Sequence, residues 1–418
     1  MKYLAVLGRQ PEISIAELEA LFSDMQILDG SCRLFSFPKN DGIFGDPLPE
    51  PSPVHVIRFE TSNVVTIAHL GGTLKLAVEL VEKPLEYLQG LPEGKITLGV
   101  SDYSKKASRK SVQQEALKLK RVLVKQGRSV RVVENKEAAL STATSLHNGL
   151  SGKNERKVEL IKVDDGWYRV IGVQDIDAYA KRDQARPARD AKVGMLPPKL
   201  AQILINLCGP LPENSVILDP FCGTGVVLQE ALLMGYRAYG TDINEWMIEY
   251  SKKNLEWLSE KYILSGTRVA PARRHGRSAL ILGRNLRNVP ESSIFSLSQG
   301  DATTFQWEQP IDAVACEGYL GKPFSKIPTE MELKEQKQEC GAIVLGFLKN
   351  LASQIKTETP VTIAAPAWLR ENGEYSRLEI VDEIEKLGYN VNNKTREGLL
   401  YHRERQVVAR DILILRKK

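Results

Sequence analysis

The chain has 418 residues, of which 42% are hydrophobic and 26% charged, as expected for a globular protein with a sizeable core and two or three domains. Its formal net charge of +5 makes it mildly basic, which permits a nucleic-acid partner without requiring one. The first residues lack a signal-peptide pattern, no apolar run approaches the roughly 20 residues that span a bilayer, and the five cysteines form no CxxC pair. These features argue against secretion, a membrane span, a zinc knuckle and a disulfide framework, so we expect a cytoplasmic protein without a metal.

The first 83 residues have the pattern of a small α+β unit. A strand at 2–7 is followed by a helix that we expect to be capped by Ser14, with Glu17 as its capping-box partner. Further along, the pattern predicts an irregular loop, a strand, and an apolar helix with a glycine interruption, at 40–53, 54–60 and 64–81.

The second part, 84–175, is marked by cations. It is predicted to contain a strand at 96–100, a long helix through Val112 and Val124, and a strand at 128–133. Cations crowd the helix and its flanks: Lys105, Lys106, Arg109, Lys110, Lys118, Lys120, Arg121, Lys125 and Arg128. Such a run is either a solvated basic face or a phosphate-binding surface, and charge alone does not separate the two. No aromatic residues are interleaved, so contact with RNA would involve its backbone and shape.

A polar, cationic and proline-containing segment, 176–198, separates this part from the next. Its Arg182, Arg186 and Arg189 either steer nucleic acid or belong to a plain spacer.

The third part, 199–418, alternates strand and helix patterns. Strands are predicted at 215–219, 237–242, 293–300, 311–316, 360–365 and 407–415, and helices at 199–207, 226–234, 245–258, 331–355 and 375–387. Repeated alternation predicts an α/β fold with a doubly wound, mostly parallel sheet. Ligands of such sheets bind at the carboxyl ends of the strands, where the strand order reverses.

Acidic residues end three successive predicted strands. Asp219 precedes a glycine-bearing turn without the lysine of a nucleotide-phosphate loop, so it suits a cationic ligand such as S-adenosylmethionine, which carries an ammonium and a sulfonium. Asp242 can accept from ribose hydroxyls, and Asp301 from the adenine amino group. The predicted donor-binding residues are Asp219, Pro220, Phe221, Cys222, Gly223, Thr224, Gly225, Asp242, Ile243, Asp301 and Ala302.

Nearly the whole chain resembles one family. The matching segments are YLAVLGRQPEISIAELEALF at 3–22, TSLHNGL at 144–150, RDxxRPxRD at 182–190, GMLPPKLA at 194–201 and DPFCGTG at 219–225. They resemble the THUMP-domain tRNA guanine-N2 methyltransferases that modify guanosine 10. The resemblance implies a ferredoxin-like domain at 1–83, a THUMP RNA-binding domain at 84–175, a linker at 176–198, and a Rossmann-like class I methyltransferase domain at 199–418. It also implies tRNA as partner and guanine N2 as methyl acceptor.

The catalytic segment departs from the pattern of amino-group methyltransferases, in which D-P-P-Y or N-P-P-Y follows the fourth strand. Here the corresponding residues are Glu317, Gly318 and Tyr319. Glu317 can accept the hydrogens of a base amino group together with the backbone carbonyl beside it at Gly318, and Tyr319 can stack on the base. The alternatives are an inactive strand-end turn in a non-catalytic RNA-binding protein, a methyltransferase of other specificity such as adenine N6 in DNA or RNA, and a C5 methyltransferase with Cys316 as nucleophile.

Between Glu260 and Glu291, the ends of a predicted insertion at 260–291, every charged residue is a cation, among them Arg273, Arg274 and Arg277. It is either an additional RNA clamp that orders on binding or a plain basic loop. The sequence carries no signal for an activator subunit or an oligomeric state.

Overall fold

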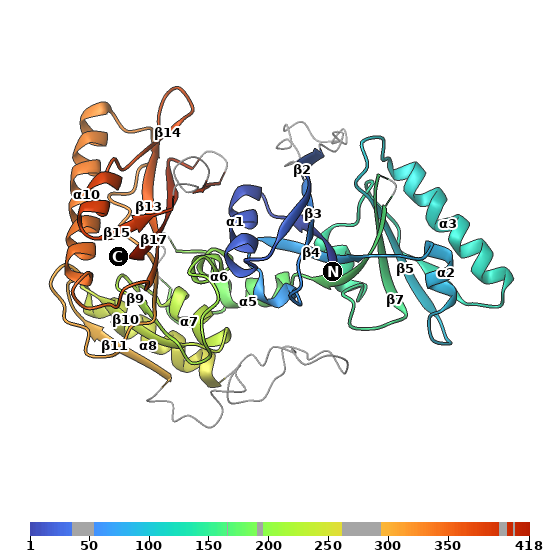
Figure 1. Cartoon of the computed structure of the whole chain (residues 1–418), viewed down its shortest axis with the longest axis horizontal. Helices are drawn as coiled ribbons and strands as arrows, with labels where there is room; N and C mark the ends of the chain where they lie inside the picture. Colours follow the sequence, from blue (N-terminus) through green and yellow to red (C-terminus); the bar gives the residue numbers. More distant parts are fainter. Residues whose placement is uncertain (36–53, 165, 190–194, 261–293, 393–398, 404–405) are drawn as a thin grey trace. The chain divides into compact units, whose positions relative to one another are not determined.

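A computed structural model describes the whole chain except residues 36–53, 165, 190–194, 261–293, 393–398 and 404–405 (Figure 1). The described residues divide into two compact units: unit 1, residues 1–14 and 22–178, and unit 2, residues 15–21 and 179–418 with the gaps just given. Within these residues no helix is both long and apolar enough to cross a membrane.

Unit 1 is built on one eight-stranded sheet in the order β2-β3-β1-β4-β8-β7-β5-β6. The pairs β5–β6 and β5–β7 are parallel and the other pairs antiparallel. Its strands are β1 (Lys2–Leu7), β2 (Gln26–Phe35), β3 (Val54–Glu60), β4 (Thr73–Glu79), β5 (Ile96–Asp102), β6 (Val130–Val132), β7 (Lys157–Val163) and β8 (Gly166–Val173). Its helices are α2 (Pro84–Gln89), α3 (Arg109–Lys125), α4 (Thr142–His147) and the 3-10 turn Ile67–His69, while α1 (Pro11–Leu21) begins in unit 1 and ends in unit 2. Strands from both sides of residue 83 join this sheet, and the domain boundary there stays a prediction.

Two predictions in the first 83 residues are wrong. Helix α1 begins at Pro11 rather than after Ser14, because proline suits the first helical turn. Ser14 lies inside the helix, and its hydroxyl donates to the carbonyl of Gly72 at 2.9 Å. The apolar segment 64–81 is a 3-10 turn and strand β4 rather than a helix, since Gly71 and Gly72 interrupt it and β4 pairs with both β1 and β8. The predicted loop 40–53 lies outside the described residues.

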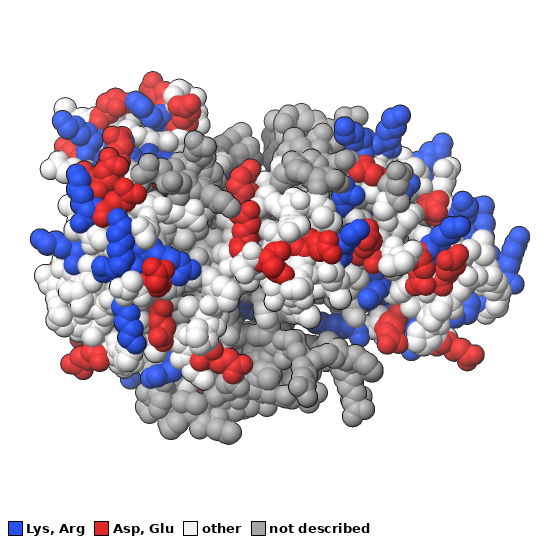
Figure 2. All heavy atoms as spheres, viewed as in Figure 1, with Lys and Arg blue, Asp and Glu red and all other residues white. Residues whose placement is uncertain are grey.

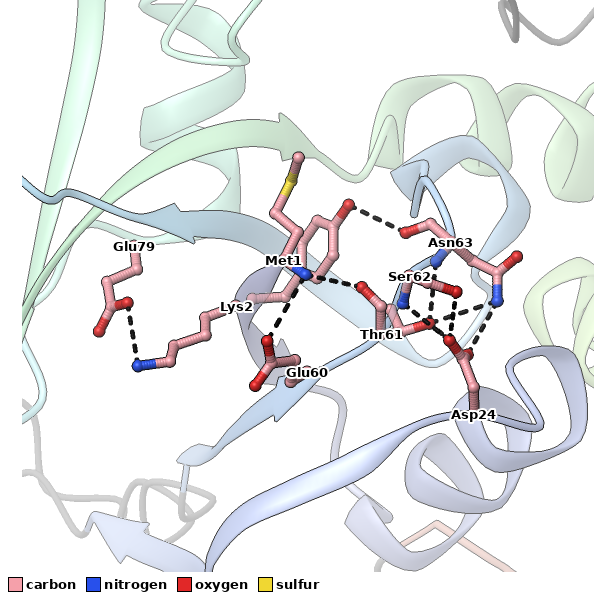
Figure 3. Close-up of polar contacts among 9 residues, drawn as sticks. Met1, Lys2, Asp24, Glu60, Thr61, Ser62, Asn63 and Glu79 are labelled. Atoms are coloured by element: carbon pink, nitrogen blue, oxygen red, sulfur yellow. Dashed lines mark hydrogen bonds and ion pairs between the residues drawn. The ribbon is translucent and has the colours of Figure 1, made fainter.

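An acidic side chain ties the end of β3 to the turn after α1. Figure 3 shows Asp24 accepting from the hydroxyl of Thr61, from the amide and hydroxyl of Ser62, and from the amide side chain of Asn63. Because these bonds favour the charged carboxylate, they lower the pKa of Asp24. The N-terminal ammonium of Met1 donates to the carbonyl of Thr61 at 2.9 Å, so the first strand is held at the same corner.

A fully buried ion pair joins β4 to β7 across β8. Lys75 Nζ lies 2.6 Å from Glu159 Oε1 and also donates to the carbonyl of Leu140 at 2.7 Å. The hydroxyl of Ser101 donates to the same carboxylate oxygen at 2.7 Å. Both side chains are almost without solvent exposure, 1% and 0%, so each charge depends on its partner.

Unit 2 is built on a nine-stranded sheet with the central order β11-β10-β9-β12-β13-β17-β15, to which β14 and β16 add at β13 and β17. The five strands from β11 to β13 are parallel, and β17 and β15 are antiparallel to their neighbours. The strands are β9 (Val216–Asp219), β10 (Arg237–Asp242), β11 (Phe295–Gln299), β12 (Ala313–Glu317), β13 (Pro360–Leu369), β14 (Tyr375–Arg377), β15 (Tyr389–Val391), β16 (Leu400–Tyr401) and β17 (Val408–Lys417). The helices are α5 (Ile176–Gln184), which starts at the end of unit 1, α6 (Pro198–Asn206), α7 (Val226–Leu233), α8 (Glu245–Leu258), α10 (Glu330–Leu351) and α11 (Val381–Lys386).

Helices cover both faces of this sheet. The alternate residues Val314, Cys316, Val361 and Ile363 share a core with Phe347 of α10. On the other face α6 packs on β12 and β13, and α7 and α8 pack on β9, β10 and β11. The predicted doubly wound, mostly parallel sheet is therefore confirmed.

Most predicted elements of unit 2 are confirmed to within a few residues, with one error. Segment 375–387 is not a single helix: Tyr375–Arg377 pairs with β13 as β14, and the helix is only Val381–Lys386. The segment 176–198 also contains more structure than a spacer, because it contributes α5. Arg182 of α5 donates from Nε and Nη2 to the two carboxylate oxygens of Glu230 at 2.6 and 3.0 Å, both side chains being buried.

Candidate active site

A pocket of about 970 Å³ opens at the carboxyl edge of the parallel strands of unit 2. The loops that follow β9, β10, β11 and β12 line it, together with the start of β17, which runs antiparallel and so begins at this edge. Strands β9 and β12 are neighbours in the sheet but not in the chain, so the strand order reverses between them. The pocket therefore lies at the topological switch point, and Asp219, Asp242, Asp301, Glu317 and Tyr319 all line it.

The turn after β9 is shaped by its two glycines. Gly223 and Gly225 have φ angles of 50° and 80°, and a Cβ at Gly225 would lie 2.9 Å from the hydroxyl oxygen of Ser251. The amide of Gly223 donates to Asp242 Oδ2 at 2.9 Å, which fixes the turn against the end of β10. The chain thus enters α7 directly beside the pocket, with Asp219 at the base of the turn.

The three strand-end acids differ in their surroundings. Asp219 is 2% exposed, and burial with nearby Asp242 and Glu317 raises its pKa, while a hydrogen bond from the amide of Phe221 opposes the rise. Burial also raises the pKa of Asp242, opposed by bonds from the amides of Asn244 and Gly223. Asp301 is exposed, and its Oδ1 accepts from the amide and hydroxyl of Thr303 at 2.8 and 2.7 Å. The site concentrates negative charge in a partly apolar hollow, which favours a cationic ligand.

Glu317 forms an ion pair with an arginine that cannot be inferred from the sequence around Glu317. Arg410 of β17 donates from Nε to Glu317 Oε1 at 2.5 Å, and the two side chains are 6% and 16% exposed. Burial raises the pKa of Glu317 while Arg410 opposes that rise. A signal is present elsewhere in the chain, because Arg410 and Asp411 are adjacent charges in the otherwise apolar strand V-A-R-D-I-L-I-L.

The two residues after Glu317 hold the rim of the pocket. The amide of Gly318 donates to the carbonyl of Ala364 at 3.0 Å, which extends the pairing of β12 with β13. Tyr319 is 37% exposed, and its hydroxyl donates to Glu339 at 3.3 Å. The ring is therefore anchored at its tip and open enough to stack on a flat ligand.

Cys316 lies apart from the pocket lining. Its side chain is 0% exposed, and burial with nearby Asp219 raises its pKa well above the ordinary value. Since the thiolate is the nucleophilic form, these surroundings disfavour the C5-methyltransferase alternative.

The cations predicted to contact RNA fall into three groups. Lys105, Lys106, Arg109 and Lys110 are exposed beside or on α3, and blue side chains gather over this part of unit 1 in Figure 2. Arg189 is exposed, whereas Arg182 and Arg186 are buried, so direct contact of these two with phosphates would require them to leave their present surroundings. Arg273, Arg274 and Arg277 and most of the insertion 260–291 lie outside the described residues.

Comparison with known proteins adds sequence relationships to this geometry. Residues 186–334 match the family described as RMKL-like, methyltransferase domain, and residues 103–253 match the family described as DNA methylase. A tRNA (guanine(10)-N2)-dimethyltransferase of Pyrococcus abyssi is 28% identical over 264 residues, which cover 62% of this chain and 69% of that protein. The protein of that name from Methanothermobacter thermautotrophicus is 46% identical over 76 residues, 18% of this chain and 22% of the relative.

Two further proteins are also similar to this chain. The type II methyltransferase M.MwoI of Methanothermobacter wolfeii is 33% identical over 97 residues, 22% of this chain and 14% of that protein. The crystal structure of TrmN from Thermus thermophilus aligns over the full length of both chains with 16% identity and a TM-score of 0.43. Together with the topology of unit 2, the match to a methyltransferase domain confirms the predicted class I methyltransferase fold. The THUMP assignment of residues 84–175 stays a prediction.

Proposed function

We propose that this chain is an S-adenosylmethionine-dependent methyltransferase that acts in the cytoplasm on the exocyclic N2 of guanine in tRNA, at position 10. The observation that carries the proposal is the convergence of Asp219, Asp242, Asp301 and Glu317 on one pocket at the switch point of the sheet. The named activity of the Pyrococcus relative supplies the substrate class.

The acidic and apolar residues that line the pocket suit the chemistry of the methyl donor. Asp219 is positioned for the ammonium and sulfonium end, Asp242 for the ribose hydroxyls, and Asp301 for the adenine amino group. Exposed Ile243 also lines the pocket and offers an apolar surface to the adenine ring. When bound, S-adenosylmethionine supplies an electrophilic methyl group.

Glu317 lies on the side of the pocket that we assign to the methyl-accepting base, and there it takes up the proton of the base amino group. That nitrogen is a weak nucleophile because its lone pair is delocalised into the ring, and Glu317 counters this by accepting a hydrogen bond from it. Attack of this nitrogen on the methyl carbon would break the carbon–sulfur bond, release the donor as a neutral thioether and leave the nitrogen positively charged, and its proton would pass to the Glu317 carboxylate. Since burial raises the pKa of Glu317, this carboxylate is a better proton acceptor than an exposed one. Tyr319 stacks on the base and holds it in line.

Unit 1 supplies the affinity for folded RNA. The exposed cations on and beside α3 would release counterions from the tRNA backbone, and no aromatic residue interrupts their run.

Nucleoside mass spectrometry of tRNA incubated with the protein and isotopically labelled donor tests the proposal. We expect label in N2-methylguanosine or N2,N2-dimethylguanosine, and a rate at least about a hundredfold lower for Glu317→Gln. Glu308→Gln is a matched control, because Glu308 is an exposed acid of the same unit that does not line the pocket. The absence of labelled guanosine from every tRNA would refute the assignment.

A second candidate is suggested by the DNA methylase match at 103–253 and by the similarity to M.MwoI. A duplex DNA methylated at an adenine or cytosine amino group in the same assay would favour it over the tRNA activity.

A further inference from the structure

The Glu317–Arg410 pair presents more hydrogen-bonding capacity to the pocket than it uses internally. Among the residues that the structure describes, Glu317 is the one hydrogen-bond partner of the Arg410 side chain, through Nε. A guanidinium has five N–H donors, so the four on the two Nη atoms remain available. A carboxylate accepts about four hydrogen bonds, of which Arg410 occupies one. Both residues line the pocket, so these groups lie at a surface that a ligand can reach.

The sheet register explains how the two side chains meet. Arg410 is opposite Pro366 on β13, and Glu317 is opposite Ala364 on the same strand. Residues two apart on a strand share a face, so Arg410 reaches across β13 above small side chains. The pair therefore sits side by side at the pocket as an acceptor next to a donor.

We propose that this pair selects guanine by its Watson–Crick edge, with Glu317 accepting from N1–H and N2–H while Arg410 donates to the O6 carbonyl. The inference rests on the proposed function and adds a specificity residue to it. Guanine offers donor, donor and acceptor along this edge, which complements a carboxylate followed by a guanidinium. Adenine would place the lone pair of its N1 against the carboxylate and its N6 amino group against the guanidinium, so it is rejected at both positions.

The test compares tRNA carrying guanine with tRNA carrying 2-aminopurine at the target position. 2-Aminopurine keeps the amino group that accepts the methyl but lacks both O6 and the N1 hydrogen, so it removes the acceptor opposite Arg410 and places the N1 lone pair against Glu317. We expect the wild-type protein to have a kcat/KM that is lower for 2-aminopurine by about tenfold or more, since Arg410 is left unpaired and Glu317 loses the N1 hydrogen; the change of this ratio in Arg410 variants then reports the part due to Arg410. In Arg410→Gln we expect guanine methylation to fall by about tenfold or more and the ratio of guanine to 2-aminopurine to shrink. Arg410→Lys should restore part of the ratio, because lysine keeps a charged donor without the fork.

The outcomes separate this inference from its alternatives. If Arg410→Gln lowers both rates by the same factor, Arg410 only positions Glu317 and the selection proposal is overturned. Arg377→Gln is the matched control, since Arg377 pairs with Asp411 on β17 and does not line the pocket. Should Arg410→Gln fail to fold, the wild-type comparison still decides, because equal rates on the two bases would overturn the proposal. If the wild-type protein methylates no guanine in tRNA, the proposed function has failed instead.

Discussion

Burial of the Asp411 side chain makes the free energy of unfolding depend on pH. Its side chain is 8% exposed and lies 3.6 Å from Arg377 Nε, a distance too long for a hydrogen bond. Burial raises the pKa of Asp411 from 3.8 to about 6, with Arg377 opposing the rise. The folded protein therefore binds the Asp411 proton more tightly than the unfolded chain does. The contribution of this protonated side chain to the free energy of unfolding is present below pH 4 and is lost as pH rises through 6.

Replacing this acid should remove that pH dependence. We expect Asp411→Asn to flatten the stability profile between about pH 4 and 6 and to raise stability at neutral pH by up to about 3 kcal/mol, given about 1.36 kcal/mol per pKa unit. Removal of the Arg377 interaction reduces this gain. Urea unfolding at several pH values measures it, and a profile as steep as that of the wild type would show that other groups carry the effect.

The donor site gives a second prediction at this scale. Asp242 receives the amides of Gly223 and Asn244, and asparagine can keep a carbonyl acceptor for only one of them. We expect Asp242→Asn to weaken S-adenosylmethionine binding by about tenfold or more, because charge-assisted bonds to the ribose are removed. Isothermal titration calorimetry is the measurement, with Glu308→Gln as control. An unchanged Kd would remove Asp242 from the donor site.

At the scale of elements, unit 1 is stabilised in its middle by a charge pair rather than by apolar packing alone. Lys75 belongs to β4 and Glu159 to β7, and β8 separates them. Burial lowers the pKa of Lys75, while Glu159 opposes that change. Removing one member leaves the other as an uncompensated buried charge, which is the costly case for such pairs.

Lys75→Met should therefore destabilise this part of the sheet by about 3–5 kcal/mol. Adding Glu159→Gln should recover part of that stability, because the glutamine oxygen can still accept from Ser101. Hydrogen-exchange mass spectrometry of the β4 and β7 peptides reports the local opening. Arg109→Met breaks an exposed pair with Glu134 and serves as control. Equal protection in the single and double variants would contradict the coupling.

An element can be predicted from the sequence when the residues that determine it lie close together in the chain. Strands β9, β10 and β12 and helix α3 carry a clear period, and the acids at the strand ends are predictable because alternation places them at one edge. The segment that contains strand β4 is predicted to be a helix. This prediction fails because the strand conformation depends on pairing with β1 and β8, which lie elsewhere in the chain. Arg410 escapes prediction for the same reason, since its partner lies 93 residues away and only the fold brings them together.

At the scale of the whole molecule, the two units carry different parts of the proposed activity. Unit 2 contains the pocket, whereas the basic run on α3 belongs to unit 1. The net charge of +5 is small, so affinity for RNA depends on where the cations are placed rather than on their total. Donor binding and tRNA binding should accordingly respond to different substitutions.

A triple substitution on α3 separates the two. We expect Lys118→Gln, Arg121→Gln and Lys125→Gln together to weaken tRNA binding and to reduce the slope of log K against log salt concentration by about 2 to 3, because each neutralised phosphate accounts for about 0.7 of that slope in single strands and about 0.9 in a duplex. The three side chains are exposed and far in sequence from the pocket residues, so S-adenosylmethionine affinity should not change. Filter binding of tRNA across a salt series and calorimetry of the donor are the measurements. The same number of charges removed from unit 2, at Lys252, Lys253 and Lys349, provides the control. If both triple variants show the same weakening, net charge alone governs binding, and α3 is not the tRNA surface.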